Sequence, residues 1–249
     1  QGNRPEPDRI AALADRIVAM VRLQRTPRTE RRLAILIPNY PNAPGRTGYA
    51  VGLDVPQSVL EMLRDLKEAG YRIEGIPESA RELLRLLDLN RSVMPFEDYR
   101  DTFGQLPEVT REKVVATWGE PETALHSPLA GIAFRAATFG NVTVALAPDR
   151  GRSADRRADY HDPELPPRHE LVAFGLWLRK ALEVHAIVHV GAHGTLEWLP
   201  GKTVALSAAC FPEIVTGPLP VVYPFIVSNP GEAAHAKRRI AAVTLGHMP

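Results

Sequence analysis

Three of the eight histidines of the chain fall within nine residues, and a glutamate continues their spacing. They are His185, His189 and His193, with Glu197 four residues further on. Imidazole nitrogens bind first-row divalent metals and titrate near neutral pH, and a carboxylate can act as a third ligand or accept a proton. If two imidazoles and the carboxylate converge, they would bind a transition metal ion or move protons. The alternative is that His189 is a hydrogen-bonded core histidine and Glu197 a loop cap.

The local sequence decides between a helical and an open arrangement of this series. A four-residue step on a helix would place the side chains on one face, as in a helical zinc site. However, Gly191, Gly194 and the apolar run Ala186–Val190 predict a strand followed by a loop. His189 would then lie at the carboxyl end of a strand, and the last two members of the series would lie on the loop.

Other motifs give weaker signals. Leu199-Pro-Gly-Lys-Thr203 ends like a phosphate-binding loop, but Leu196 stands where that motif needs glycine, and Pro200 lacks a backbone donor. We therefore expect no direct ATP binding by this chain. Cys210 has no neighbouring catalytic partners in sequence and is expected to be a buried small hydrophobe, and Ser207 lacks the context of a nucleophile.

Two further loops contain residue types that bind ligands. Residues 38–54 hold three glycines, three prolines and Arg46, a composition that suits a fixed loop close to a ligand. The alternative is a structural crossover in which Asp54 caps the next helix. Residues 160–169 hold two histidines and two carboxylates. Asp162 or Glu164 is a candidate ligand there, and a surface turn is the alternative.

The periodicity of apolar residues predicts alternating helices and strands that would position these groups. Helices are predicted at 8–25, 56–69, 78–90, 108–118, 169–183 and 230–247, and strands at 32–37, 71–76, 141–147, 186–190 and 221–227. This alternation predicts an α/β fold, a Rossmann-like or flavodoxin-like layered fold with a mostly parallel sheet and helices on both faces. Residues 1–30 would form a helical lead-in segment, and 31–249 an α/β region with a helical insertion at about 91–140.

Ligands of such sheets bind beyond the carboxyl ends of the strands. The segments expected there are 38–54, 148–166, 191–202 and 228–232. Because loops of this length exceed the usual two to six residues, they favour a functional role.

Composition excludes several classes of protein. Lys and Arg total 30 and Asp and Glu total 29, so no global charge favours nucleic acid or an anionic membrane. One cysteine excludes an internal disulfide and a thiolate-rich zinc site and fits a reducing compartment, so we expect a cytoplasmic protein. No apolar run approaches the roughly 20 residues that span a bilayer. The first residue is Gln, and we expect an internal fragment of a longer protein.

Several separated blocks, taken in order, resemble the large subunit of the aerobic cobaltochelatases and, more generally, the macrocycle-binding large subunits of class I chelatases, including the magnesium chelatase H subunit. The blocks are Asn39-Tyr-Pro-Asn42, Gly45-Arg46, Val51-Gly-Leu-Asp54, Phe139-Gly-Asn-Val142, Arg150-Gly151, Tyr160-His-Asp-Pro163, Leu165-Pro-Pro167, His193-Gly-Thr-Leu-Glu-Trp-Leu-Pro-Gly201, Tyr223-Pro-Phe225, Asn229-Pro-Gly-Glu232 and Ala236-Lys-Arg-Arg239. They cover about residues 39–247, and the family's subunit is several times longer. His189 and the Pro-Phe-Ile at 224–226 resemble the cobalt enzymes more than the magnesium enzymes.

This resemblance implies ATP-driven insertion of Co²⁺, as a substrate, into hydrogenobyrinic acid a,c-diamide in cobalamin biosynthesis. It implies that His193 and His189 hand over the metal and that Glu197 accepts a proton or acts as a third ligand. The residues expected to bind the macrocycle are Arg46, Arg150, Trp198 and Lys202. ATP would be hydrolysed by separate AAA+ ATPase and adaptor subunits.

Three alternatives stay open at this point. The chain could belong to the magnesium branch, with protoporphyrin IX as substrate. It could be a scaffold that docks the ATPase subunits, or a freestanding divalent-metal-binding domain. In each chelatase case we expect the isolated piece to be inactive.

Overall fold

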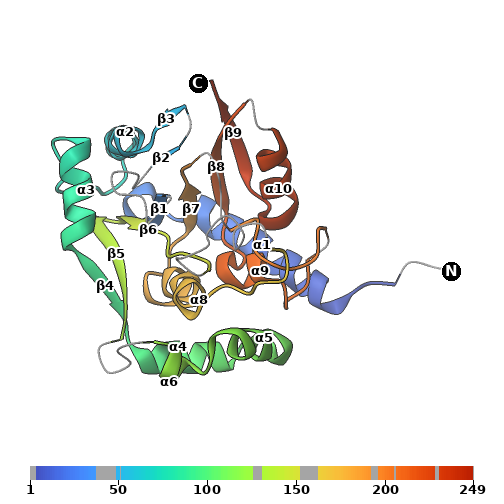
Figure 1. The fold of residues 1–249 in the computed structure, drawn as a ribbon. Coiled ribbons are helices and arrows are strands. Elements are labelled where there is room, and N and C mark those ends of the chain that lie inside the picture. The colour runs from blue at the N-terminus through green and yellow to red at the C-terminus, as the bar shows by residue number, and fades with distance from the viewer. Residues whose placement is uncertain are drawn as a thin grey trace.

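The protein forms an α/β fold around a mixed sheet (Figure 1). The computed structural model describes residues 4–37, 49–50, 52–125, 131–151, 162–191, 196–204, 206–227 and 230–248. Within these residues a seven-stranded sheet has the order β4-β5-β6-β1-β7-β8-β9, and β2 and β3 form a separate two-stranded ribbon. The strands are β1 (Leu33–Ile37), β2 (Tyr49–Ala50), β3 (Leu53–Asp54), β4 (Arg91–Met94), β5 (Ile132–Phe139), β6 (Val142–Leu146), β7 (Ala186–His189), β8 (Val221–Ile226) and β9 (Val243–His247).

Five neighbouring strands of the sheet are parallel. β1 pairs in parallel with β6 on one side and β7 on the other, and β8 and β9 continue the parallel set. β5 and β4 are added antiparallel at one edge. The predicted mostly parallel sheet is confirmed. The carboxyl ends of β6, β1, β7 and β8 therefore share one edge, and the site-bearing segments predicted from the sequence follow these ends.

Strand β1 shows why a continuous apolar run suits the centre of such a sheet. All five of its side chains are buried. Leu33, Ile35 and Ile37 face one core, and Ala34 and Leu36 face the other. Because helices cover both faces, no polar side of the strand is needed.

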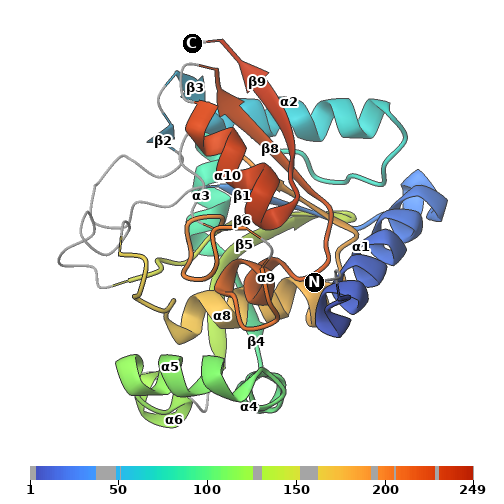
Figure 2. The same ribbon diagram turned by 90° about the vertical axis from the view of Figure 1, so that its right-hand side faces the viewer.

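The helices cover both faces of the sheet, as predicted. Those described are α1 (Pro7–Arg25), α2 (Val55–Glu68), α3 (Ala80–Leu89), α4 (Phe96–Gly104), α5 (Glu108–Trp118), α6 (Pro121–Ala124), α8 (His169–Leu176, continued by a π-helical turn Trp177–Ala181), α9 (Phe211–Thr216) and α10 (Pro230–Ile240). Side chains of α2 and α3 pack on one face, and those of α4, α5, α8, α9 and α10 belong to the core on the other. Helices α4, α5 and α6 lie beyond α8, away from the sheet (Figures 1 and 2). Asp54 caps α2 by accepting a hydrogen bond from the backbone N–H of Gln57 (3.1 Å).

Three sequence predictions about elements were wrong in part, each because of tertiary pairing. Residues 71–76 form no strand, because β5 occupies the place beside β6. Their contact with the sheet is a hydrogen bond from the backbone N–H of Asn141 to the carbonyl of Arg72. The segment 91–140 is not purely a helical insertion, since β4 and β5 flank α4–α6 and extend the sheet. The last helix ends at Ile240 rather than near 247, because the chain turns at Ala241 (φ 52°) and β9 pairs along β8.

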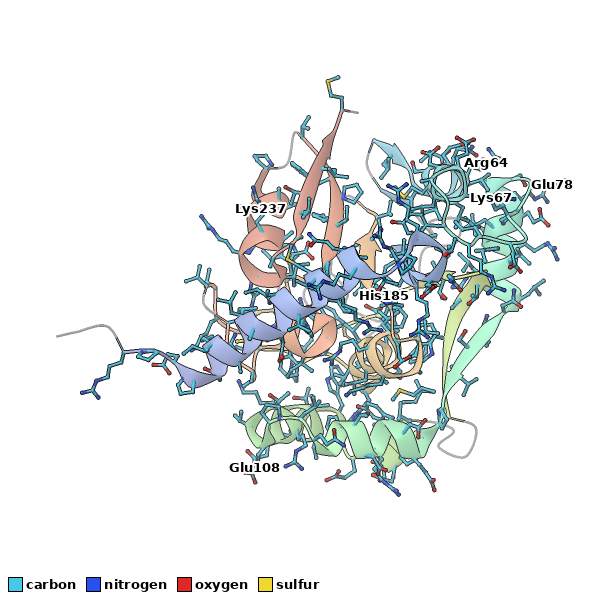
Figure 3. All side chains as sticks on the ribbon, turned by 180° about the vertical axis from the view of Figure 1, so that it is seen from behind. Arg64, Lys67, Glu78, Glu108, His185 and Lys237 are labelled. Atoms are coloured by element: carbon cyan, nitrogen blue, oxygen red, sulfur yellow. The ribbon has the colours of Figure 1, made fainter. Side chains whose placement is uncertain are left out.

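The lead-in helix α1 crosses the back of the molecule (Figure 3). Arg9 binds both carboxylate oxygens of Glu213 (2.8 and 3.0 Å), and Arg16 donates to the carbonyl of Ile240 (3.3 Å). Leu13 and Ile17 are 60% and 53% exposed, so an apolar stripe of α1 faces solvent. Within the described part of the chain, no helix is long and apolar enough to cross a membrane.

Candidate functional site

The strand predicted at 186–190 is confirmed as β7 (Ala186–His189), with His189 at its carboxyl end. His185 lies just before β7, where its Nδ1 accepts a hydrogen bond from the backbone N–H of Arg32 (2.9 Å). His189 is the last residue of β7 and pairs with Leu36 of β1. These two histidines therefore lie at opposite ends of one strand, and His185 has a structural role. His193 and Arg46 lie outside the described residues.

His189 is a buried and neutral imidazole. It is 1% exposed, and its ring stacks on that of Tyr223 in β8, with the centroids 5.6 Å apart. Burial lowers the pKa of His189 to about 4, although the negative charge of Glu232 opposes this effect. Its Nδ1 has no hydrogen-bond partner among the described residues. A neutral imidazole with an unused nitrogen is the form that binds a metal ion.

Glu197 is completely buried, and neither of its carboxyl oxygens has a hydrogen-bond partner within the described ranges. Burial raises the pKa of Glu197 to about 8. The residue's own backbone N–H is the largest opposing influence on this pKa; the charge of Glu232 raises it further, and the charge of Arg239 lowers it. A buried polar group without a partner is destabilising by about 1–3 kcal/mol. Buried groups with such perturbed pKa values concentrate at functional sites, where they act as acids, bases or ligands.

Glu232 connects the two groups electrostatically. It is 6% exposed at the start of α10, and its Oε2 accepts a hydrogen bond from the indole Nε1 of Trp198 (3.1 Å). Its charge raises the pKa of both His189 and Glu197. Sequence analysis placed residues 228–232 among the segments beyond the strand ends, but it did not select Glu232 as a site residue. Its position after the carboxyl end of β8 was the available signal.

The structure gives different surroundings to the residues expected to bind the macrocycle. Trp198 is partly buried, and the centroid of its ring lies 4.0 Å from the centroid of the His235 ring. The side chain of Lys202 is exposed. Arg150 is 1% exposed and donates to the carbonyls of Trp198 (3.1 Å) and Asp162 (2.8 Å). Arg150 therefore joins the loops after β6 and β7, and its guanidinium is not presented to solvent.

Cys210 is buried, as expected, but its sulfur is more than a packing group. The Sγ atom accepts hydrogen bonds from the backbone N–H of Lys202 (3.4 Å) and Ser207 (3.3 Å). Burial raises the pKa of the Cys210 thiol, yet these hydrogen bonds, that from the Ser207 hydroxyl and the charge of Arg239 outweigh it and lower the pKa overall. Gly201 packs so closely that an added Cβ would lie 2.8 Å from the Cβ of Cys210. The sulfur therefore holds the turn that follows Glu197.

The segment before α8 has a structural role in its described part. The Asp162 carboxylate accepts from the backbone N–H of Glu164 (2.8 Å), and both residues are exposed, which is the surface-turn alternative. His169 is buried, with Nδ1 2.6 Å from the hydroxyl of Tyr99 and Nε2 3.0 Å from the carbonyl of Gly119. Since a carbonyl only accepts, Nε2 donates and the Tyr99 hydroxyl donates to Nδ1.

No group of three His, Cys, Asp or Glu side chains among the described residues has the spacing of a metal site. In the described part of the chain, His189, Glu197 and Glu232 therefore do not form a three-ligand metal site by themselves.

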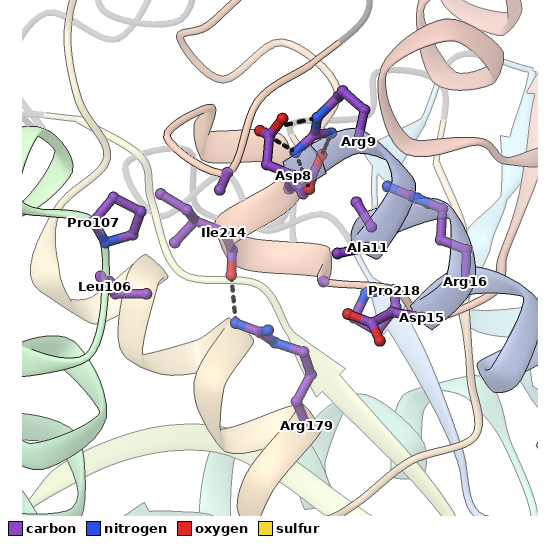
Figure 4. Close-up of a pocket in the computed structure, with 14 residues that line it drawn as sticks. Asp8, Arg9, Ala11, Asp15, Arg16, Leu106, Pro107, Arg179, Ile214 and Pro218 are labelled. Carbon is purple, nitrogen blue, oxygen red and sulfur yellow. Dashed lines mark hydrogen bonds and ion pairs between the residues drawn. The ribbon is translucent and has the colours of Figure 1, made fainter. Parts of the chain in front are cut away.

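A groove of about 340 Å³ lies elsewhere, between α1, α9 and Leu106–Pro107 (Figure 4). None of the site residues above lines it. Two arginines that line the groove donate hydrogen bonds to other groups of the protein: Arg9 to the carboxylate of Glu213, and Arg179 to the carbonyl of Ile214 (2.5 Å). These contacts join α1, α8 and α9, and we assign the groove no catalytic role.

Comparison with known proteins gives a consistent result. The family model described as CobN/Magnesium Chelatase matches residues 1–249. The chain is 43% identical, over 97% of its length, to the aerobic cobaltochelatase subunit CobN of Pseudomonas aeruginosa, and covers 20% of that protein. It is 30% identical, over 96% of its length, to the chloroplastic magnesium-chelatase subunit ChlH of Oryza sativa subsp. indica, and covers 18% of it.

A solved structure shares the fold. The catalytic subunit of cobaltochelatase from Mycobacterium tuberculosis matches with a TM-score of 0.84 and 36% identity, over 98% of this chain and 22% of that one. The chain thus spans about a fifth of the length of the relatives it matches.

Proposed function

The chain belongs to the CobN/magnesium chelatase family, and we propose on that premise that it is the site-bearing region of a cytoplasmic cobaltochelatase large subunit. In this role it inserts Co²⁺ into hydrogenobyrinic acid a,c-diamide in aerobic cobalamin biosynthesis. The observation that carries the proposal is the pair of buried groups His189 and Glu197, one neutral with an unused nitrogen and the other with unused carboxyl oxygens.

Insertion requires that the metal ion lose water and that the ring lose protons. His189 is already neutral at pH 7, so it binds Co²⁺ without first releasing a proton. The His189 imidazole, together with that of His193 four residues further along the chain, takes the place of water on the ion. Because imidazole is a ligand of intermediate strength, the ion can leave for four ring nitrogens.

Replacing two ring N–H groups with Co²⁺ releases two protons and moves no electrons between oxidation states. Because its pKa is about 8, the Glu197 carboxyl is mostly protonated at pH 7; once it has released that proton to solvent, the carboxylate accepts one of the ring protons and is a stronger base than an ordinary carboxylate. The second proton passes to His193. Glu197 then returns its proton to solvent when the product leaves.

The macrocycle is held by groups around this pair. The partly buried indole of Trp198 packs on its apolar face, and the exposed Lys202 pairs with a side-chain carboxylate. Arg46 is a second carboxylate partner, and Arg150 keeps the loops in place through their carbonyls. ATP is hydrolysed by AAA+ ATPase and adaptor subunits, and the region alone does not turn over.

Calorimetric titration with Co²⁺ and with hydrogenobyrinic acid a,c-diamide tests the assignment. Wild type is compared with a His193→Ala, Glu197→Gln double variant, and Glu164→Gln is the matched control because Glu164 is an exposed carboxylate on a neighbouring loop. We expect the double variant to lose Co²⁺ binding and the control to retain it. Equal binding by all three proteins would contradict the site, and absorbance titration with protoporphyrin IX distinguishes the magnesium branch.

In the complete subunit with its partners, Glu197→Gln removes the proton acceptor but keeps the size of the side chain. Insertion should therefore be abolished while macrocycle binding, followed by absorbance, is retained. Undiminished turnover would exclude Glu197 as the base. The partner subunits could bind equally well to wild type and to a His193→Ala variant that no longer binds Co²⁺. That result alone would not support the alternative of a scaffold that docks the ATPase subunits, because docking and metal binding would then be separate functions of the same region.

A further inference from the structure

Three side chains of helix α10 contact one short loop. Glu232, His235 and Arg239 are spaced by three and four residues and so lie on one face of the helix. Each contacts the loop 197–202. This loop contains Glu197, so the helix face and the candidate base are directly connected.

Arg239 spans the loop from end to end. Its Nη1 donates to the carbonyl of Glu197 (2.6 Å), and its Nε donates to the carbonyl of Lys202 (3.2 Å). The side chain is 7% exposed. A planar guanidinium can hold two carbonyls at a fixed separation, which the single ammonium of lysine cannot do in the same geometry.

The other end of α10 holds the side chain next to Glu197. The Glu232 carboxylate accepts from Trp198 Nε1 (3.1 Å), and the Trp198 ring contacts the ring of His235. Side chains of α10 thus hold both the backbone of Glu197 and the side chain of Trp198 in position.

The same unit also contacts the other half of the pair. Strand β8 precedes α10 in the chain, and its Tyr223 stacks on the ring of His189. The β8–α10 unit therefore touches the imidazole through its strand and the carboxylate loop through its helix. A displacement of α10 relative to β8 would change the separation of His189 and Glu197.

We propose that α10 is the positioning helix of this site, with Glu232 and Arg239 as the positioning residues that place Trp198 and Glu197 relative to His189. The effect of this positioning on catalysis rests on the function proposed above. The claim that α10 fixes the positions of Trp198 and Glu197 does not. Neither Glu232 nor Arg239 needs to touch the metal ion or the macrocycle.

The geometric content is tested by ¹⁹F NMR of the chain labelled with 5-fluorotryptophan, in which Trp198→Phe assigns the Trp198 resonance. Glu232→Ala should shift and broaden that resonance, because the indole loses its acceptor. Glu232→Gln should restore it, since the amide oxygen accepts the same bond. The Trp118 resonance is the internal control for folding, because its Nε1 donates to the carbonyl of Pro166 (3.0 Å). An unchanged Trp198 resonance in Glu232→Ala would overturn the proposal.

The functional content is tested with Arg239→Lys, and Lys237→Met on the exposed side of α10 is the matched control. Residues that orient a ligand without contacting the metal typically change affinity or activity by about 10–100-fold. We expect Arg239→Lys to lower kcat of the complete chelatase by at least about tenfold, with the KM for the macrocycle within about twofold, and Lys237→Met to change neither. Equal kcat in Arg239→Lys and wild type would overturn the positioning role.

The two proposals fail in different ways. If wild type neither binds Co²⁺ nor supports insertion, the proposed function fails, and the Trp198 resonance still decides whether α10 positions the loop. If wild type is active and the Trp198 resonance does not respond to Glu232→Ala, the inference about α10 fails alone.

Discussion

Replacing Glu197 by glutamine should remove most of the pH dependence that this side chain contributes to the free energy of unfolding. Glutamine has nearly the same volume and cannot ionise, so the substitution isolates the effect of the buried charge. The pKa of Glu197 is raised from 4.5 to about 8, chiefly by burial. The folded protein therefore keeps the proton over a range of pH in which the unfolded chain releases it.

The sign follows from this order of proton release. The contribution of the protonated carboxyl is fully present below pH 4.5, falls as the pH rises, and is lost by about pH 8, where the folded state also ionises. The pKa difference corresponds to about 5 kcal/mol over the whole range, because each pH unit contributes about 1.4 kcal/mol. At pH 7 the loss is about 3 kcal/mol.

Urea unfolding followed by circular dichroism at pH 5, 6, 7, 8 and 9 measures this effect. Glu197→Gln should match wild type within about 1 kcal/mol at pH 5 and exceed its stability by several kcal/mol at pH 9. Glu164→Gln, at an exposed position, should follow wild type throughout. If wild type and Glu197→Gln differ by the same amount from pH 5 to 9, the carboxyl does not ionise as its burial requires, and its role as a strong base is refuted.

Three further predictions concern other parts of the structure. Burial lowers the pKa of His189 from 6.5 to about 4, so the contribution of the neutral imidazole to the free energy of unfolding is fully present above pH 6.5, and about 3 kcal/mol of it is lost by pH 4. A His189→Phe variant should lack this loss in urea unfolding; if wild type and variant lose the same stability between pH 6.5 and pH 4, the prediction is contradicted. Gly201→Ala should lower stability by about 2 kcal/mol in thermal unfolding, because φ is +145° and the new Cβ meets Cys210 at 2.8 Å, whereas Gly104→Ala meets nothing within 4 Å and should not. Leu13→Lys in α1 should change the free energy of unfolding by less than about 0.5 kcal/mol, because Leu13 is 60% exposed; a larger loss would mean that the apolar stripe is covered.

The sequence by itself determined the parts of the protein that depend on local pattern. The run Leu33–Ile37 is apolar at every position, which is sufficient to indicate a strand buried on both faces. The glycine at 191 and the apolar residues before it were sufficient to place His189 at a strand end. The ordered blocks around Glu197 and Glu232 were sufficient to indicate the family, which the comparisons confirm.

Tertiary structure decided the elements and roles that depend on distant partners. Residues 243–247 continue a helical pattern in sequence, yet they form a strand because the edge of β8 offers five paired positions. The separation of His185 from His189 and the engagement of Arg150 by carbonyls of two loops likewise follow from contacts across the fold. The importance of Glu232 is of the same kind: its charge matters because burial places it near an imidazole and a carboxyl that lie 43 and 35 residues away in the chain. Sequence spacing cannot reveal such a contact, since electrostatic effects depend on distance and solvent exclusion in space.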